Sequence, residues 1–132
     1  MVVDNNNVML VLRRKVISGL LIEAIQKRAE MTAFGVYEFN KAKNMAMVRQ
    51  PKIALVEIPE RHGTPAQDAL DVCEEIKEVS PGCKVMLICP ENDEESVKAC
   101  LEAVKKGKIN DFLFYDSSVD YLVAKLESLL PV

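Results

Sequence analysis

Short apolar segments recur along the chain and are separated by stretches long enough to form helices. These segments are residues 8–12, 34–39, 53–58, 85–89 and 112–115. Four of them are nearly continuous apolar runs, which is typical of parallel strands covered by helices on both faces. The second run is interrupted by Gly35 and Glu38, so it is predicted to be an edge strand.

The stretches between these segments carry apolar residues at the three- and four-residue spacing of an amphipathic helix. The first such stripe, predicted to face the core, contains Val16, Ile17, Leu20, Leu21, Ala24 and Ile25. Regular alternation of strands and helices predicts the α/β class, with a doubly wound five-stranded parallel sheet between two helical layers. Right-handed crossovers favour the flavodoxin-like strand order 2-1-3-4-5. Residues 1–7 are predicted to be a flexible tail and residues 8–130 a single domain.

Composition and charge narrow the functional classes. The chain has 132 residues, which fits one core, and its formal net charge of −3 argues against a nucleic-acid-binding surface. Its apolar runs are too short to span a bilayer, and its first residues lack a signal-peptide pattern, so we expect a cytoplasmic protein without membrane contact. Basic residues gather in residues 13–52 and acidic residues in residues 57–95, a segregation that is typical of solvated helix faces and that can also steer partners or self-association.

The cysteine and histidine content does not indicate a metal centre. The four cysteines, at positions 73, 83, 89 and 100, form no Cys-x-x-Cys pair, and His62 is the only histidine. We therefore expect reduced cysteines, no metal and no cofactor, with His62 as a solvated loop residue. The chain contains no glycine-rich nucleotide-binding motif and no convincing pair of nucleophile and base, so no catalytic residue is assigned and no enzymatic activity is expected.

The apolar frame resembles response-regulator receiver domains of two-component signalling over about residues 8–130. The resemblance is carried by Val8-Met9-Leu10-Val11-Leu12-Arg13-Arg14-Lys15 as first strand and helix start and by Pro51-Lys52-Ile53-Ala54-Leu55-Val56-Glu57 as third strand. Val85-Met86-Leu87-Ile88-Cys89 resembles the fourth strand and Asn110-Asp111-Phe112-Leu113-Phe114-Tyr115 the fifth. The resemblance implies a signalling domain that switches on phosphorylation of an aspartate.

The residues at the positions of the family's active site differ from the family pattern. Leu12 and Arg13 stand where the family has the acid pair that holds Mg²⁺, and Glu57 stands at the phospho-accepting aspartate. Cys89 replaces the switch hydroxyl, and Tyr115 replaces the lysine. Because Mg²⁺ prefers several oxygen ligands and a transferring phosphoryl group needs nearby cations, these replacements predict a pseudo-receiver without phosphotransfer.

Several readings of the replaced residues remain open. Arg13 is predicted to form an ion pair with Glu57, whereas Glu57 alone is compatible with mimicry of a phosphorylated aspartate. Cys89 fits either an inert core thiol or a redox sensor. Tyr115 is interpreted mainly as a packing residue. The bond between Tyr115 and Asp116 is predicted to be trans, because a cis bond that does not precede proline costs about 3–4 kcal/mol.

The resulting functional prediction is protein–protein signalling, through a protein partner or a homodimer. The resemblance implies contact through the fourth helix, fifth strand and fifth helix, with these candidate residues: Val97, Lys98, Leu101, Lys105, Phe114, Tyr121 and Lys125. The alternative is a small-molecule or oxyanion-binding domain that uses the Arg13-Arg14-Lys15 loop, because ligands of such sheets bind where the strand order reverses.

Overall fold

The computed structural model describes residues 6–28, 31–59 and 65–130 of the 132-residue chain. Its sheet contains β1 (Asn7–Val11), β2 (Thr32–Val36), β3 (Ile53–Glu57), β4 (Lys84–Cys89) and β5 (Asp111–Phe114). All neighbouring strands are parallel, in the order β2-β1-β3-β4-β5. This arrangement confirms the predicted fold class and strand order.

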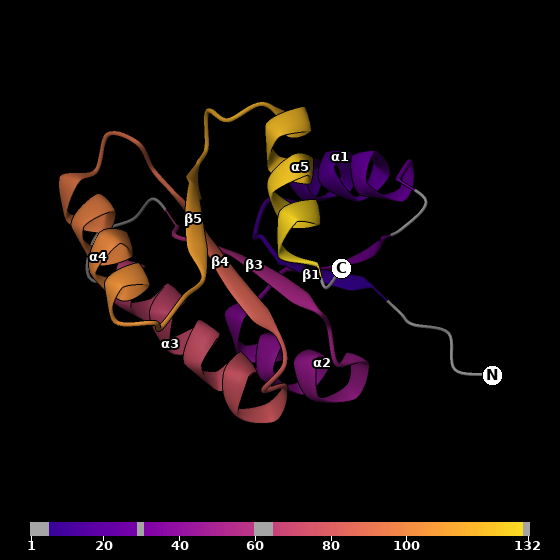
Figure 1. The fold of residues 1–132 in the computed structure, drawn as a ribbon, viewed down its shortest axis with the longest axis horizontal. Coiled ribbons are helices and arrows are strands. Elements are labelled where there is room, and N and C mark those ends of the chain that lie inside the picture. The colour runs from indigo at the N-terminus through magenta and orange to yellow at the C-terminus, as the bar shows by residue number, and fades with distance from the viewer. Residues whose placement is uncertain (1–5, 29–30, 60–64, 131–132) are drawn as a thin grey trace.

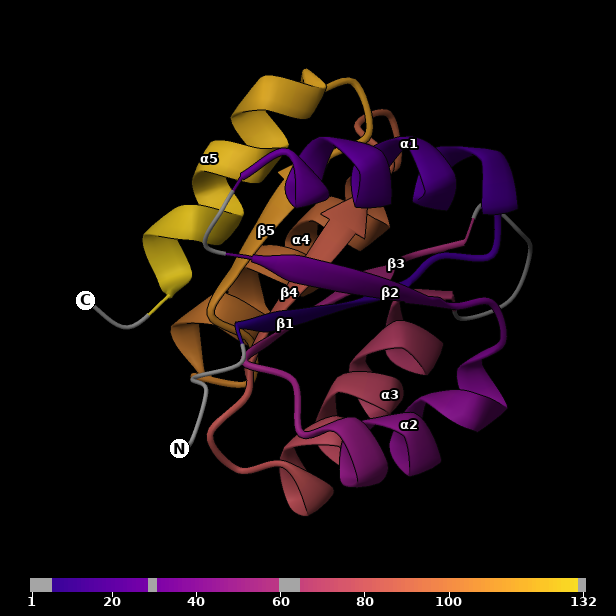
Figure 2. The ribbon, with the colours of Figure 1, turned by 90° about the vertical axis from the view of Figure 1, so that its right-hand side faces the viewer.

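In the described part of the chain, five α-helices cover the two faces of this sheet. They are α1 (Lys15–Gln26), α2 (Ala42–Arg49), α3 (Pro65–Val79), α4 (Glu94–Lys105) and α5 (Val119–Leu129), with a short 3-10 turn at Phe39–Lys41 before α2. Figure 1 shows the helices around the twisted sheet, and Figure 2 shows α1 and α5 on one face with α2 and α3 on the other. The fold therefore has the predicted three layers.

The core is divided by the sheet into two apolar clusters. Because successive side chains of a strand point to opposite faces, Met9 and Val11 pack with the cluster around α2, α3 and α4. Leu10, from the same strand, packs with Leu21 and Leu126 in the cluster on the α1 and α5 side. Burial on both faces explains why the central strands read as continuous apolar runs.

The structure corrects the predicted bounds of the second strand. Strand β2 begins and ends earlier than the predicted range 34–39, because it pairs in register with β1 from Asn7↔Thr32 to Val11↔Val36. The side chain of Thr32 also donates a 2.7 Å hydrogen bond to Oδ1 of Asn7, which is the first residue of β1. As predicted, β2 lies at an edge of the sheet.

The predicted core stripe of the first helix is also partly wrong. Val16 and Leu20 are 78% and 57% exposed, whereas Ser18, Leu21 and Ile25 form the buried stripe. The helix packs on the sheet through Ser18, Leu21 and Ile25, so Val16 and Leu20 on its other side face solvent. Spacing alone did not distinguish these two faces, because apolar residues occur on both.

Candidate functional site

The carboxyl ends of β1, β3 and β5 bring together three of the positions singled out in the sequence. Glu57 is the last residue of β3 and is only 3% exposed. The backbone N–H of Arg13 donates a hydrogen bond to its Oε1, and the Tyr115 hydroxyl donates one of 2.5 Å to its Oε2. Both oxygens of this buried carboxylate therefore have a hydrogen-bond donor, which offsets the cost of removing the group from water.

The predicted ion pair between the side chains of Arg13 and Glu57 is wrong. Arg13 reaches the carboxylate through its main chain, and its side chain is exposed. Among the residues that the structure describes, no ion pair joins Glu57 to a basic side chain. Leu12, at the neighbouring position, is buried in the core, and its side chain carries no oxygen that could bind a metal ion.

Tyr115 has a polar role that the sequence interpretation missed. Besides its hydrogen bond to Glu57, its hydroxyl lies 3.5 Å from the carbonyl oxygen of Ile58, and its ring packs beside the α1 and α5 cluster. The guanidinium carbon of Arg14 lies 5.5 Å from the ring centre, a cation–π distance. The interpretation of Tyr115 as mainly a packing residue is therefore incomplete.

The loop that follows Tyr115 has ordinary peptide geometry. No cis peptide bond occurs in residues 6–28, 31–59 and 65–130, so the bond between Tyr115 and Asp116 is trans, as predicted. The hydroxyl of Ser118 then accepts a hydrogen bond of 3.1 Å from the backbone N–H of Tyr121 and caps α5.

Cys89 ends β4 and is fully buried. Its thiol donates a 3.4 Å hydrogen bond to the carbonyl oxygen of Pro90, and interaction with Cys100 lowers its pKa. The same interaction, together with burial, raises the pKa of Cys100. Burial also raises the pKa values of Cys73 and Cys83 to about 12. All four cysteines are free thiols in the core.

Two hollows of about 480 Å³ each lie beside the ends of β1 and β2. The first is lined by residues that include Arg13, Lys15, Tyr37 and Lys41. The second shares Arg13 and Tyr37 with the first and is also lined by Arg14 and Glu57. The three residues of the Arg13-Arg14-Lys15 loop therefore do not share one site. Lys15 lines only the first of these two hollows and Arg14 only the second.

Tyr37 and Lys41 were not among the candidate residues. They belong to the connection from β2 to α2, because Tyr37 directly follows β2 and Lys41 lies in the short turn before α2. The candidate residues of the sequence lie at the ends of β1, β3, β4 and β5. Tyr37 was not found because the predicted range 34–39 placed it inside the second strand, whereas it is the first residue beyond the carboxyl end of β2.

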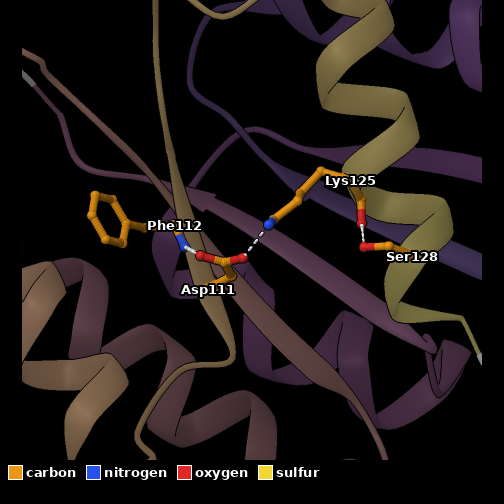
Figure 3. A network of polar contacts seen from close by, with 4 residues as sticks. All are labelled: Asp111, Phe112, Lys125 and Ser128. Atoms are coloured by element: carbon orange, nitrogen blue, oxygen red, sulfur yellow. Dashed lines mark hydrogen bonds and ion pairs between the residues drawn. The ribbon is translucent and has the colours of Figure 1, made fainter.

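The predicted interaction face contains exposed side chains as well as side chains that are half-buried or held in an ion pair. Leu101 and Tyr121 are 53% and 54% exposed, whereas Val97 and Phe114 are half-buried. The exposed Lys105 and Lys98 lie on α4. Lys125 forms a 2.6 Å ion pair with Asp111, which raises the pKa of the lysine through hydrogen bonding and charge (Figure 3).

Metal-binding clusters and membrane-spanning helices are two further features that would indicate another class of site. In the described part of the chain, no three histidine, cysteine, aspartate or glutamate side chains group so as to hold a metal ion. None of the helices in that part is long and apolar enough to cross a membrane. His62 lies outside the described residues, as do residues 1–5 of the predicted tail.

Comparisons with known proteins relate the fold to receiver domains. A response regulator from Thermotoga maritima has a TM-score of 0.75 and 14% identity, with 95% of this chain and 97% of that chain covered. The Francisella response regulator 1452 receiver domain has a TM-score of 0.74 and 14% identity, with 95% and 96% covered. At these identities the likeness shows a shared fold.

A solved structure with a different name has the same architecture. The adenylate cyclase from Rhodopirellula baltica has a TM-score of 0.79 and 13% identity, with 95% of this chain and 87% of that chain covered. No protein-family model matches the chain, and no curated protein sequence matches it. The chain thus has the flavodoxin-like fold of response-regulator receiver domains.

Proposed function

We propose that this chain is a non-enzymatic, receiver-like domain of two-component or phosphorelay-type regulation, which signals through protein–protein contacts without phosphotransfer at Glu57. The observation that carries the proposal is the state of the Glu57 carboxylate. It is buried, and its two oxygens accept hydrogen bonds from the Arg13 N–H and the Tyr115 hydroxyl.

Two features of this site oppose phosphotransfer, namely the hydrogen bonds to the Glu57 carboxylate and the lack of carboxylate ligands for Mg²⁺ beside it. A carboxylate attacks phosphorus through an oxygen lone pair, and hydrogen bonds to both oxygens reduce its nucleophilicity. Charge on the transferring phosphoryl group is normally neutralised by a metal ion and nearby cations. At this edge of the sheet Leu12 is buried and Arg13 is basic, so neither supplies a carboxylate oxygen for Mg²⁺.

The surface of α4, β5 and α5 is the part of the domain that we propose for partner binding. Leu101 and Tyr121 supply large exposed apolar area, and tyrosine is enriched at protein interfaces. The rings of Phe112 and Phe114 lie edge to face with centres 5.6 Å apart on the strand between the two helices. The ion pair of Lys125 with Asp111 joins α5 to the beginning of β5.

The absence of phosphotransfer is tested by incubation with acetyl phosphate and Mg²⁺, followed by intact-mass measurement. We expect no added phosphoryl group on the wild-type protein. The matched comparison is the double variant Arg13→Asp, Glu57→Asp, which places two carboxylates at the ends of β1 and β3 and should gain Mg²⁺ affinity. A stoichiometric phosphoryl adduct at Glu57 of the wild type would overturn the proposal.

The partner surface is tested with charge substitutions at its exposed apolar positions. The variant Leu101→Glu, Tyr121→Glu should lose homodimerisation or binding of its cognate partner, measured by analytical ultracentrifugation or pull-down. Val48→Glu is the control, because Val48 is 76% exposed on α2, a helix that is not part of the proposed surface. Equal association of both variants would exclude this surface.

A further inference from the structure

A basic hollow of about 480 Å³ lies where β1 and β2 end, beside the turn before α2. The residues of its lining that carry the argument are Arg13, Lys15, Gly35, Tyr37, Glu38 and Lys41. They come from three separate segments, namely the start of α1, the end of β2 and the 3-10 turn. The volume falls within the range of small-molecule sites, about 300–1,000 Å³.

The charges that line this hollow are mostly positive. Lys41 forms a 2.7 Å ion pair with Glu38, which is the one carboxylate on the described lining. In the described part of the chain, neither Arg13 nor Lys15 forms an ion pair, and the Lys15 ammonium lies 5.3 Å from the centre of the Tyr37 ring. Three cations and a single carboxylate line the hollow, so its lining carries a net positive charge that a bound anion would neutralise.

Gly35 allows two hydroxyl groups to lie close to the strand beneath the hollow. A Cβ at this position would lie 2.7 Å from the Tyr37 hydroxyl oxygen and 2.9 Å from Ser18 Oγ. Ser18 Oγ is buried and has no hydrogen-bond partner among the described residues. Tyr37 lines the hollow and Ser18 does not, so the Tyr37 hydroxyl is the hydrogen-bond donor beside the basic side chains, a combination that suits phosphate oxygens.

We propose that this hollow binds a phosphate dianion, free or as a phosphomonoester, through Arg13, Lys15 and Lys41, with the Tyr37 hydroxyl as a further donor. The site goes beyond the proposed signalling function and does not depend on it. It differs from the sequence-based oxyanion alternative, because Lys41 takes the place of Arg14. The neighbouring hollow is a poorer anion site, since it is lined by the buried Glu57.

The site is tested by isothermal titration of the full chain with inorganic phosphate and, in a separate arm, with phenyl phosphate. Tighter binding of phenyl phosphate would identify an ester as the ligand type, whereas equal affinities would identify the free anion. Amide chemical shifts should change at Gly35 and Tyr37 in both arms and stay constant at Gly107, which lies outside this lining.

Matched variants locate the binding. Arg13→Ala and Lys41→Ala should each weaken phosphate binding by about tenfold, as expected for loss of a charge-assisted contact. Glu38→Gln should strengthen it, because the competing carboxylate is removed. The control is Lys84→Ala, because Lys84 is the first residue of β4 and is not part of the lining of this hollow. Arg13→Ala keeps the backbone N–H that Glu57 requires, so the fold is retained.

Two results would overturn the proposal. One is the absence of saturable binding of either phosphate compound at millimolar concentrations. The other is an equal affinity of Arg13→Ala, Lys41→Ala and Lys84→Ala, since binding would then not depend on the side chains of this hollow.

Discussion

The Tyr115 hydroxyl lies 2.5 Å from Oε2 of Glu57, although 58 positions separate the two residues in the sequence. Parallel pairing of β3, β4 and β5 brings their carboxyl ends to one edge and makes this contact possible. The Glu57 carboxylate is buried, so a positively charged partner would also have to be removed from water, at a cost in free energy. The Tyr115 hydroxyl is a neutral donor and avoids that cost. The pair thus links the carboxyl end of β3 to the end of β5.

Removal of this hydroxyl tests the contact. Tyr115→Phe should lower the free energy of unfolding by about 1–3 kcal/mol, because one oxygen of a buried carboxylate loses its donor while the ring is retained. Urea denaturation gives the value. The control Tyr121→Phe changes an exposed hydroxyl and should alter stability by less than about 0.5 kcal/mol. Equal stability of the two variants would contradict the contact.

The sequence predicted the sheet better than it predicted the site. The central strands are buried on both faces, so their uninterrupted apolar runs, such as Val8 to Leu12, identified the fold and its order. The hydrogen bond from Arg13 to Glu57 was missed because it uses a backbone N–H, which every residue except proline carries and no motif records. Residue types suggested an ion pair instead.

The hollow beside β2 was missed for a related reason. Lys41 reaches it from the turn before α2, and Tyr37 from one residue beyond the edge strand, so the cluster exists only after β2 has paired with β1. The predicted bounds of that strand extended to residue 39. They placed Tyr37 inside the strand and hid its position at the edge where ligands bind.

Two glycines with different surroundings provide a second prediction. Gly35→Ala should destabilise the protein by about 1–3 kcal/mol, because the added methyl group would overlap the Tyr37 hydroxyl and Ser18 Oγ. Gly19→Ala should stabilise it by about 0.5–1 kcal/mol, since Gly19 lies inside α1 with open space around its Cα. Thermal unfolding measures both effects, and changes of the same sign would contradict this reading of Gly35.

The ion pair of Lys125 with Asp111 is expected to contribute little. Both side chains are 31% exposed, so Lys125→Gln should cost less than about 1 kcal/mol, and the cost should shrink in concentrated salt. Lys98→Gln, on the exposed side of α4, is the control for loss of one positive charge. Asp111 keeps its 2.8 Å hydrogen bond from the Phe112 N–H in the variant, as Figure 3 shows for the wild type. A cost above about 2 kcal/mol that does not respond to salt would refute this assignment.

The buried thiols predict a loss of stability at high pH. Burial raises the pKa values of Cys73 and Cys83 from 9.0 to about 12, so these thiols stay protonated in the folded chain while they ionise in the unfolded chain. Their contribution to the free energy of unfolding is complete below pH 9. It is lost as the pH rises towards 12, by up to about 1.4 kcal/mol per thiol and pH unit.

Urea denaturation at several pH values above 9 tests this effect. The free energy of unfolding should decline less steeply with pH for the variant Cys73→Ala, Cys83→Ala than for the wild type. The comparison uses slopes, so the constant cost of the two cavities cancels, and the lysines and tyrosines titrate in both proteins. Equal slopes would mean that the two thiols ionise as readily in the folded chain as in the unfolded one.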